Sequence, residues 1–279
     1  MIGWWQRGLQ RWRAQRQSRA LVRRAIPDAL WRLTLARLPF LAARDEADLA
    51  ELRRLSSLFL DEKEFSGAGG LVVDDAMALC IAAQACLPVL RFGLAPYRHF
   101  VGIVVHPDEV VARREVTDDD GIVHAYDEVL TGEAMAGGPV MLSWVDAAEA
   151  PESSDADDWA YNVVIHEFAH VLDMADGQAN GVPPQKTQAE RDAWAALIDT
   201  EFEQFCQAVD NGADTLIDPY GASAVEEFFA VSAECFFVRP QAMRARHPDW
   251  YGLLARYFEQ DPAALKPTGR RAAGPGSSG

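Results

Sequence analysis

Apolar residues recur at helical spacing in two long parts of the chain, and short strand-like runs lie between these parts. In 45–62, for example, Leu49, Leu52, Leu55 and Leu58 are three residues apart, which places them along one face of a helix. The pattern predicts helices at about 45–62, 74–86, 159–173, 187–209, 223–237 and 241–259, and strands at 101–105, 129–130 and 140–144. We therefore expect an α+β fold with a small mixed sheet and a mainly helical C-terminal half.

Charge is distributed unevenly along the chain. Residues 1–24 contain seven arginines and no acidic residue, although the whole chain has a formal net charge of −16. The strongly acidic charge of the chain after residue 24 argues against direct binding of nucleic acid, which needs clustered Lys and Arg. The basic segment 1–24 fits either a terminal helix that rests on the protein's own acidic surface or a segment that binds an anionic membrane or a partner.

These boundaries suggest one folded domain at 25–262, with an α/β part at about 25–158 and a helical part at about 159–262. The Gly/Ser-rich residues 263–279 are expected to form a disordered tail. No apolar run approaches the ~18–20 residues needed to span a bilayer, and 1–24 lacks the apolar core of a signal peptide. The four cysteines show no C-x-x-C spacing and read as buried reduced thiols, so we expect a cytoplasmic protein.

The most informative segment is His166-Glu167-Phe168-Ala169-His170, an H-E-x-x-H motif inside an apolar run without Pro or Gly. Two His four residues apart lie on one helical face, so both imidazoles can bind one zinc ion. Glu167 is rotated by about 100° from His166, where a general base for the activated water would stand. The alternative is an ordinary polar helix surface, but the apolar flanks favour a buried helix whose polar groups need a metal.

Zinc requires a third protein ligand, and the sequence offers two sources for it. Asp176 is the local candidate, by analogy with metzincins. However, Asp173 stands where those enzymes have the Gly that lets the chain turn back. The other source is a Glu from the predicted helix 223–237.

That helix contains three carboxylates. Ser223 and Glu226 fit a capping box, in which the Glu side chain reaches back to the first backbone amide of the helix. Glu227 and Glu234 remain, two turns apart on one stripe of an otherwise apolar helix. Spacing favours Glu227 as the ligand and leaves Glu234 as a supporting or surface carboxylate.

Several motifs in the same order resemble the Mlc titration factor A family, over roughly residues 25–262. They are His166–Met174, Asp176–Pro183, Ile217–Ser223 and Glu227–Phe237, with shorter matches at Cys86–Leu90, Gly121–His124 and Gly138–Trp144. The resemblance implies a zincin-like, bacterial cytosolic zinc peptidase of the gluzincin type with aminopeptidase activity. Its catalytic core would be similar to that of anthrax lethal factor, in which a Tyr precedes the third ligand by seven residues.

On this resemblance one zinc ion is bound by His166, His170 and Glu227, with Glu167 as the base and Tyr220 stabilising the oxyanion. A peptide substrate is expected, and a Mlc-type glucose repressor is a possible protein partner through which sugar uptake would be regulated. The alternative is a non-enzymatic regulator that keeps the zincin fold and sequesters a transcription factor. Asp173 and Glu234 are candidates for orienting a ligand His, and the role of His124 stays open between site and core.

A peptidase must also hold an extended substrate. Residues 139–144 read as a strand that directly precedes the motif helix. We expect it either to be the sheet edge that pairs with substrate backbone or to be an internal core strand.

Overall fold

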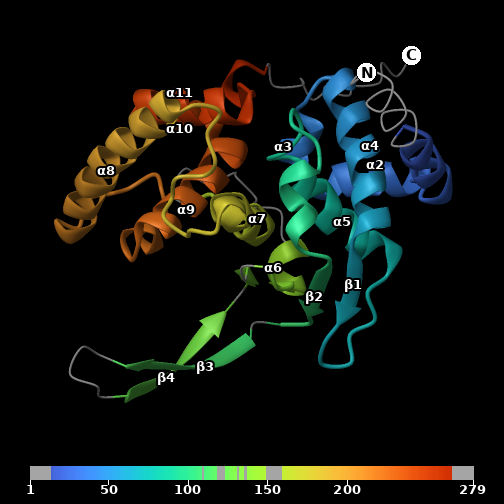
Figure 1. Cartoon of the computed structure of the whole chain (residues 1–279), viewed down its shortest axis with the longest axis horizontal. Coiled ribbons are helices and arrows are strands. Elements are labelled where there is room, and N and C mark those ends of the chain that lie inside the picture. Colours follow the sequence, from blue (N-terminus) through green and yellow to red (C-terminus); the bar gives the residue numbers. More distant parts are fainter. Residues whose placement is uncertain are drawn as a thin grey trace, which may run out of the picture.

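The computed structural model describes residues 14–108, 110–117, 123–130, 132–134, 137–148 and 159–265, with backbone only for 110–117 and 123–130. Two helical halves lie side by side, and the small sheet lies below the N-terminal half in the view of Figure 1. The N-terminal half contains α2 (Asp28–Arg37), α3 (Pro39–Ala42), α4 (Glu46–Glu62), α5 (Asp75–Cys86) and the 3₁₀ helix η1 (Ala95–His99). Asp45 and Asp74 begin α4 and α5 as N-caps, because each carboxylate accepts a bond from a first-turn amide.

The four-stranded sheet has the order β1 (Glu64–Gly67), β2 (Gly102–His106), β6 (Val140–Ser143) and β5 (Gly132–Ala134). The pairs β1–β2 and β2–β6 are parallel, whereas β5 is antiparallel to β6. A separate hairpin of β3 (Val110–Thr117) and β4 (Val123–Leu130) extends away from the body (Figure 1). The interpretation of 139–144 as an edge strand is therefore wrong, because β6 is paired on both sides, and β1 and β5 form the two edges.

The C-terminal half is helical, as predicted. It contains α7 (Val163–Asp173), η2 (Met174–Asp176), α8 (Gln188–Asp210), η3 (Pro219–Ala222), α9 (Val225–Val238), α10 (Pro240–Arg246), α11 (Pro248–Phe258) and η4 (Pro262–Ala264). A short helix that was not predicted, α6 (Trp144–Ala148), precedes this half. The α+β prediction is thus confirmed. Ala263, expected to lie in the tail, is buried in η4, and residues 266–279 lie outside the described part of the chain.

Three helix boundaries differ from those predicted. The motif helix begins at Val163 rather than near 159, because Asn162 caps it in an extended conformation. The expected capping box of Ser223 and Glu226 is absent: α9 has Ala224 as its N-cap, without a side-chain cap. The predicted helix 241–259 is broken at His247, since Pro248 disfavours helical backbone in the residue before it.

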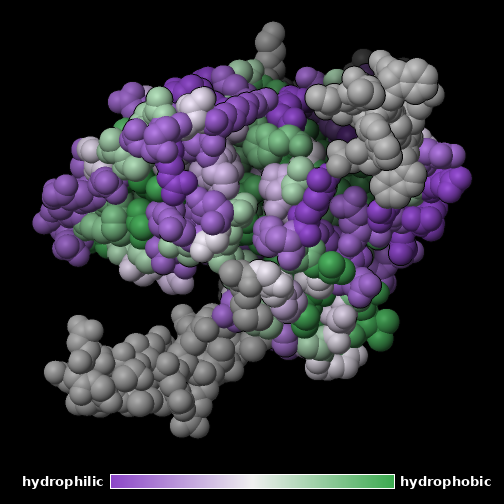
Figure 2. Space-filling view, in the orientation of Figure 1, coloured by the Kyte–Doolittle hydropathy of each residue, from purple (hydrophilic) through white to green (hydrophobic). Residues whose placement is uncertain are grey.

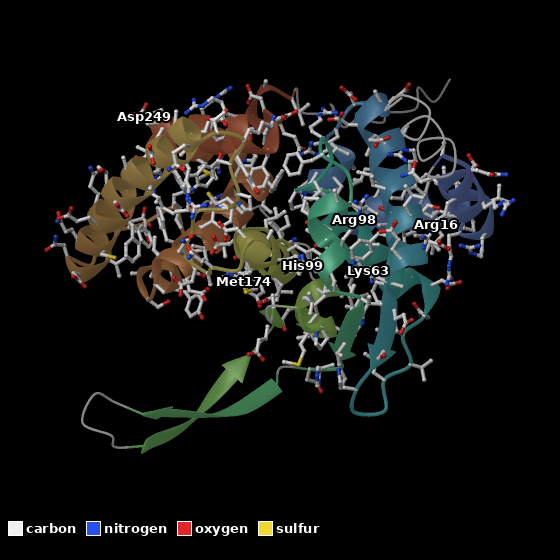
Figure 3. All side chains as sticks on the ribbon, in the orientation of Figure 1. Arg16, Lys63, Arg98, His99, Met174 and Asp249 are labelled. Atoms are coloured by element: carbon white, nitrogen blue, oxygen red, sulfur yellow. The ribbon has the colours of Figure 1, made fainter. Side chains whose placement is uncertain are left out.

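Helix α7 lies between the two halves and is the centre of the core. It packs on α5, α9 and strands β5 and β6. Phe168 on α7 contacts the rings of Phe59, Tyr97 and Phe100 from the N-terminal half, at centroid distances of 5.0–5.9 Å. The segment η2, which follows α7, also meets η1, where Figure 3 places Met174 close to His99, and α9 packs on α7 from the C-terminal half. The motif helix is therefore held by core packing from both halves.

Hydrophilic side chains cover most of the face seen in Figure 2, and hydrophobic ones show through where the two halves meet. Within the described residues, no helix has the length and apolar character required to cross a bilayer.

Candidate metal centre

Three potential ligand atoms from α7 and α9 converge on one point. The Nε2 atoms of His166 and His170 are 3.1 Å apart, and Glu227 Oε2 lies 3.1 Å from the first and 3.3 Å from the second. Within the described residues, these three side chains form the cluster whose ligand atoms all lie within 4.8 Å of one another. The helical spacing of the two His and the crossing of α9 over α7 together produce this arrangement.

The donor set suits a metal ion. Two imidazole nitrogens and a carboxylate oxygen face one another. Their lone pairs repel one another unless a proton or a cation lies between them. Two imidazoles and a carboxylate are a common protein ligand set for a divalent metal with one open position. All three side chains are partly exposed, and the neighbouring Tyr220 is 52% exposed, so the cluster opens to solvent.

The electrostatics of the cluster also favour a cation. Burial alone would lower the pKa of His166, but hydrogen bonds to Glu227 and Glu234 outweigh burial and raise that pKa well above its ordinary value. Burial alone would raise the pKa of Glu227, yet its bonds with His166 and His170 bring it far below the usual range. The site therefore holds Glu227 as an anion facing both imidazoles.

Glu167 contributes no atom to this ligand cluster and is 4% exposed. Its Oε2 atom has no hydrogen-bond partner in the described part of the chain. Burial, only partly opposed by the two nearby His, raises the pKa of Glu167 from 4.5 to about 7. The edge strand β5 lies directly against it: a Cβ atom added to Gly132 would stand 2.5 Å from Glu167 Oε1. Glycine at 132 is therefore what allows strand and carboxylate to approach so closely.

A buried polar chain supports His166 from behind. His166 Nδ1 lies 2.8 Å from Glu234 Oε1, and the other oxygen of Glu234 accepts a hydrogen bond from the backbone amide of Asn162. The Asn162 side chain caps α7 by accepting from Ile165 at 2.9 Å, and it donates to Gln84 Oε1 on α5 at 2.7 Å. Asn162, Glu234 and Gln84 are at most 2% exposed. These hydrogen bonds thus connect α5 in the N-terminal half of the protein to His166.

The remaining candidates lie around this centre. Tyr220 stands in η3, held by the Asp218 cap, with its ring centroid 6.2 Å from that of His166. The Oδ2 atom of Asp173 accepts bonds from Asn180 and Gly181 and so fixes the loop after α7; no bond to His170 is present. Burial raises the pKa of Asp173 to about 6.

Two candidates fall outside the cluster. Asp176 pairs with Arg191 at 2.9 Å and contributes no atom to the ligand group. His124 lies in β4 opposite Val116, and its side chain is outside the described part of the structure.

Sequence reasoning missed Asn162, Gln84 and Gly132. An Asn directly before a long apolar run is a readable N-cap signal. Gln84 sits inside an apolar helix, where a buried amide needs partners, but nothing in the sequence identifies Asn162 as that partner. Gly132 belongs to a strand of three residues, too short for a periodic pattern.

Known proteins resemble this chain over most of its length. Residues 9–259 match the model of the glucose-regulated metallopeptidase family M90. An uncharacterised protein of Synechocystis is 35% identical over 250 residues, covering 88% of this chain and 89% of its own length. Proteins named Mlc titration factor A are 34% identical in Edwardsiella ictaluri (81% of this chain, 85% of the relative) and 33% in Escherichia coli (83% and 86%). The metallopeptidase family fits the α+β, zincin-like fold, and the chain belongs to the glucose-regulated metallopeptidase family M90.

Proposed function

We propose that the protein is a zinc peptidase in which His166, His170 and Glu227 hold one Zn²⁺. The observation that supports this most strongly is the convergence of their three ligand atoms beside the buried Glu167. When bound, zinc would act as a Lewis acid on the scissile carbonyl and would lower the pKa of a water molecule. Glu234 would keep the proton on Nδ1 of His166, so that Nε2 is free to act as a ligand.

Glu167 is the proton carrier in this mechanism. Its raised pKa of about 7 lets it accept a proton from the attacking water and then give that proton to the leaving amine near neutral pH. A cation on the three ligands would favour the ionised carboxylate and move this pKa downward. Burial of Glu167 against β5 fixes its position while keeping bulk water away from it.

The substrate would lie along β5. This strand is the edge of the sheet that lies beside the metal cluster, and its Gly132 lies against the carboxylate of Glu167. An extended peptide could add to this edge by backbone hydrogen bonds, which would place a peptide bond beside the metal ligands. The strand expected to do this, β6, would instead support β5 from inside the sheet.

Tyr220 is proposed to donate a hydrogen bond to the oxyanion. Tyr220→Phe should therefore lower kcat by about 10²–10³-fold while KM changes little, because the bond forms only in the transition state. Steady-state kinetics on a peptide substrate measures this. Tyr161→Phe, a change at another partly exposed tyrosine, is the control, and a Tyr220→Phe enzyme with kcat within threefold of wild type would contradict the role.

The hydrogen bonds that join Gln84, Asn162 and Glu234 to His166 should affect metal binding. Asn162→Ser keeps a capping oxygen but removes the donor to Gln84, leaving a buried amide oxygen without a partner. We expect the free energy of unfolding to fall by about 1–3 kcal/mol and zinc affinity to fall by roughly tenfold. Chemical denaturation and competition with a chelator measure the two effects. Asn211→Ser, at the exposed end of α8, is the control; unchanged zinc affinity in Asn162→Ser would show that the chain is only structural.

Cleavage from the amino terminus is the finer proposal, and a Mlc-type repressor is the proposed protein partner, since relatives carry the name Mlc titration factor A. The same name favours a second candidate function, a regulator that binds a transcription factor without cleaving it. The two functions differ in their need for Glu167, which a purely binding protein would not use.

The test is hydrolysis of a peptide library with free and with acetylated amino termini, by protein loaded with zinc and by protein treated with a chelator. An aminopeptidase cleaves only the free termini, and only with metal. Activity that survives complete metal removal would reject the metallopeptidase mechanism. Metal-dependent repressor binding without cleavage of any peptide would favour the regulator.

A further inference from the structure

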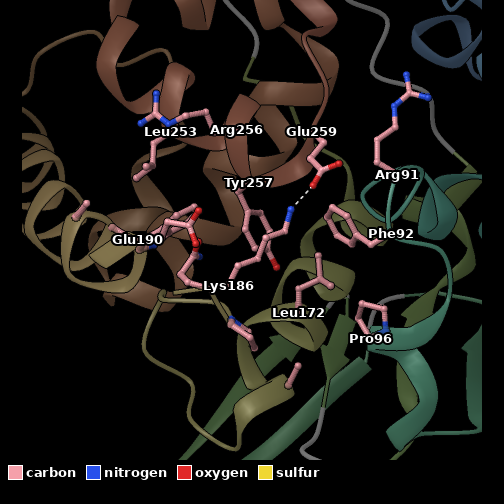
Figure 4. A pocket seen from close by; sticks show the side chains of 15 residues that line it. Arg91, Phe92, Pro96, Leu172, Lys186, Glu190, Leu253, Arg256, Tyr257 and Glu259 are labelled. Atoms are coloured by element: carbon pink, nitrogen blue, oxygen red, sulfur yellow. Dashed lines mark hydrogen bonds and ion pairs between the residues drawn. The ribbon is translucent and has the colours of Figure 1, made fainter. Parts of the chain in front are cut away.

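A second cavity lies behind α7. It has a volume of about 590 Å³, is open to solvent, and is bounded by the segment before η1, the start of α8 and the end of α11 (Figure 4). Leu172 forms part of its floor. Leu172 follows His170 by two residues, a rotation of about 200°. The cavity is thus on the opposite face of the helix from the metal ligands.

The cavity has the size and the mainly apolar walls of a small-molecule site. Phe92 from the N-terminal half and Trp194 from α8 flank Tyr257, with ring centroids 5.8 and 5.2 Å from that of Tyr257. The Tyr257 hydroxyl group points toward Leu172 (Figure 4), and it makes no hydrogen bond to any described residue. A ligand could therefore meet the partly exposed aromatic rings of Phe92 and Tyr257.

The charged side chains at the rim differ in whether they have an ion-pair or hydrogen-bond partner. Lys186 and Glu259 pair across the opening at 2.5 Å, and Arg91 pairs with Asp48. The other lining carboxylate, Glu190, accepts a bond from the Thr187 hydroxyl group. Arg256 alone among the lining charges has no ion pair or hydrogen bond within the described part of the chain. An anionic group on a ligand could pair with this guanidinium group, which has no partner of its own in the described part of the chain.

We propose that this cavity is a ligand site, distinct from the metal centre, for a small molecule with an aromatic or aliphatic body and one anionic group such as a carboxylate or sulfonate. The apolar body would lie on the partly exposed rings of Tyr257 and Phe92, with the buried Trp194 behind them, and the anion would lie at Arg256. The inference does not rest on the proposed peptidase function, since no metal ligand lines the cavity.

Two fluorescent probes test the proposal on the full chain. The anion 8-anilinonaphthalene-1-sulfonate and the neutral N-phenyl-1-naphthylamine share one aromatic body and differ in the sulfonate. We expect saturable binding of both to the folded wild type, with the anion bound more tightly. Arg256→Gln should weaken binding of the anion by about three- to fivefold, as for an exposed charge pair, and leave the neutral probe unchanged. Arg32→Gln, a remote exposed arginine on α2, is the control.

A second pair of variants tests the location. Ala193 on α8 lines the cavity from an exposed position, so Ala193→Phe fills it without disturbing the core. Binding of both probes should be lost in Ala193→Phe and kept in Ala196→Phe, an exposed site on the same helix outside the lining. Absence of saturable binding to wild type, or binding that survives in Ala193→Phe, would overturn the site. Equal loss of both probes in Arg256→Gln would overturn its anionic selectivity.

Discussion

Glu167→Gln is expected to lower kcat for peptide hydrolysis by about 10²–10⁴-fold, while zinc remains bound. Gln has nearly the same shape as Glu but cannot accept and return a proton. The ligand atoms of His166, His170 and Glu227 lie on other side chains, so the metal site should keep its geometry. Kinetics and metal analysis on the same sample measure both parts, and a variant within tenfold of wild-type kcat would remove Glu167 from the mechanism.

The same substitution should change the pH dependence of stability in metal-free protein. The pKa of Glu167 rises from 4.5 to about 7 on folding, so the folded state favours the protonated carboxyl group. The resulting contribution to stability is complete below about pH 4.5 and is lost as the pH rises through 7. Gln removes this loss, and the variant should therefore gain about 3 kcal/mol relative to wild type between pH 4 and pH 8.

Unfolding by denaturant in the presence of a chelator, at several values of pH, measures that gain. Added zinc should reduce it, because a nearby cation stabilises the ionised Glu167 in wild type. A difference between variant and wild type that is constant across this pH range would show that the carboxyl group does not titrate with a raised pKa.

Glu227→Ala is expected to abolish stoichiometric zinc binding and, with it, hydrolysis. Partners that only orient a ligand account for about 10–100-fold in affinity, so removal of a ligand itself should cost more than about 100-fold. Glu226→Ala provides a matched control one residue away, since Glu226 lies outside the ligand cluster and does not cap the helix. Zinc content after dialysis and affinity by competition measure the effect. Comparable zinc affinity in the two variants would reject Glu227 as a ligand.

Local patterns predicted the helices well but not their exact ends. The apolar stripes of α4, α5 and α8 appear in the structure within one residue of the predicted bounds. The start of α7 was placed too early because apolar residues continue before Asn162, and only the cap determines where helical backbone begins. The break at His247 was readable from Pro248, whose effect on the preceding residue is purely local.

Long-range relations were less accessible. Strand order depends on which segments meet in space, so the sequence did not distinguish β6 as an interior strand from β5 as the edge. Glu227 and Glu234 share one stripe of α9. Glu227 faces Nε2 of His166 and Glu234 faces Nδ1, and spacing alone does not predict this assignment. The chain through Asn162 and Gln84 joins residues 78 positions apart, which no local pattern predicts.

The central claim is that one zinc ion lies between α7 and α9 on three named side chains. Anomalous X-ray diffraction from crystals of the zinc-loaded protein, with data above and below the zinc absorption edge, tests it most directly. We predict one zinc peak per chain, at coordination distance from His166 Nε2, His170 Nε2 and a Glu227 oxygen. Glu234 should be hydrogen-bonded to His166 Nδ1. A peak at other residues, or no peak at this cluster in zinc-saturated crystals, would contradict the proposed site.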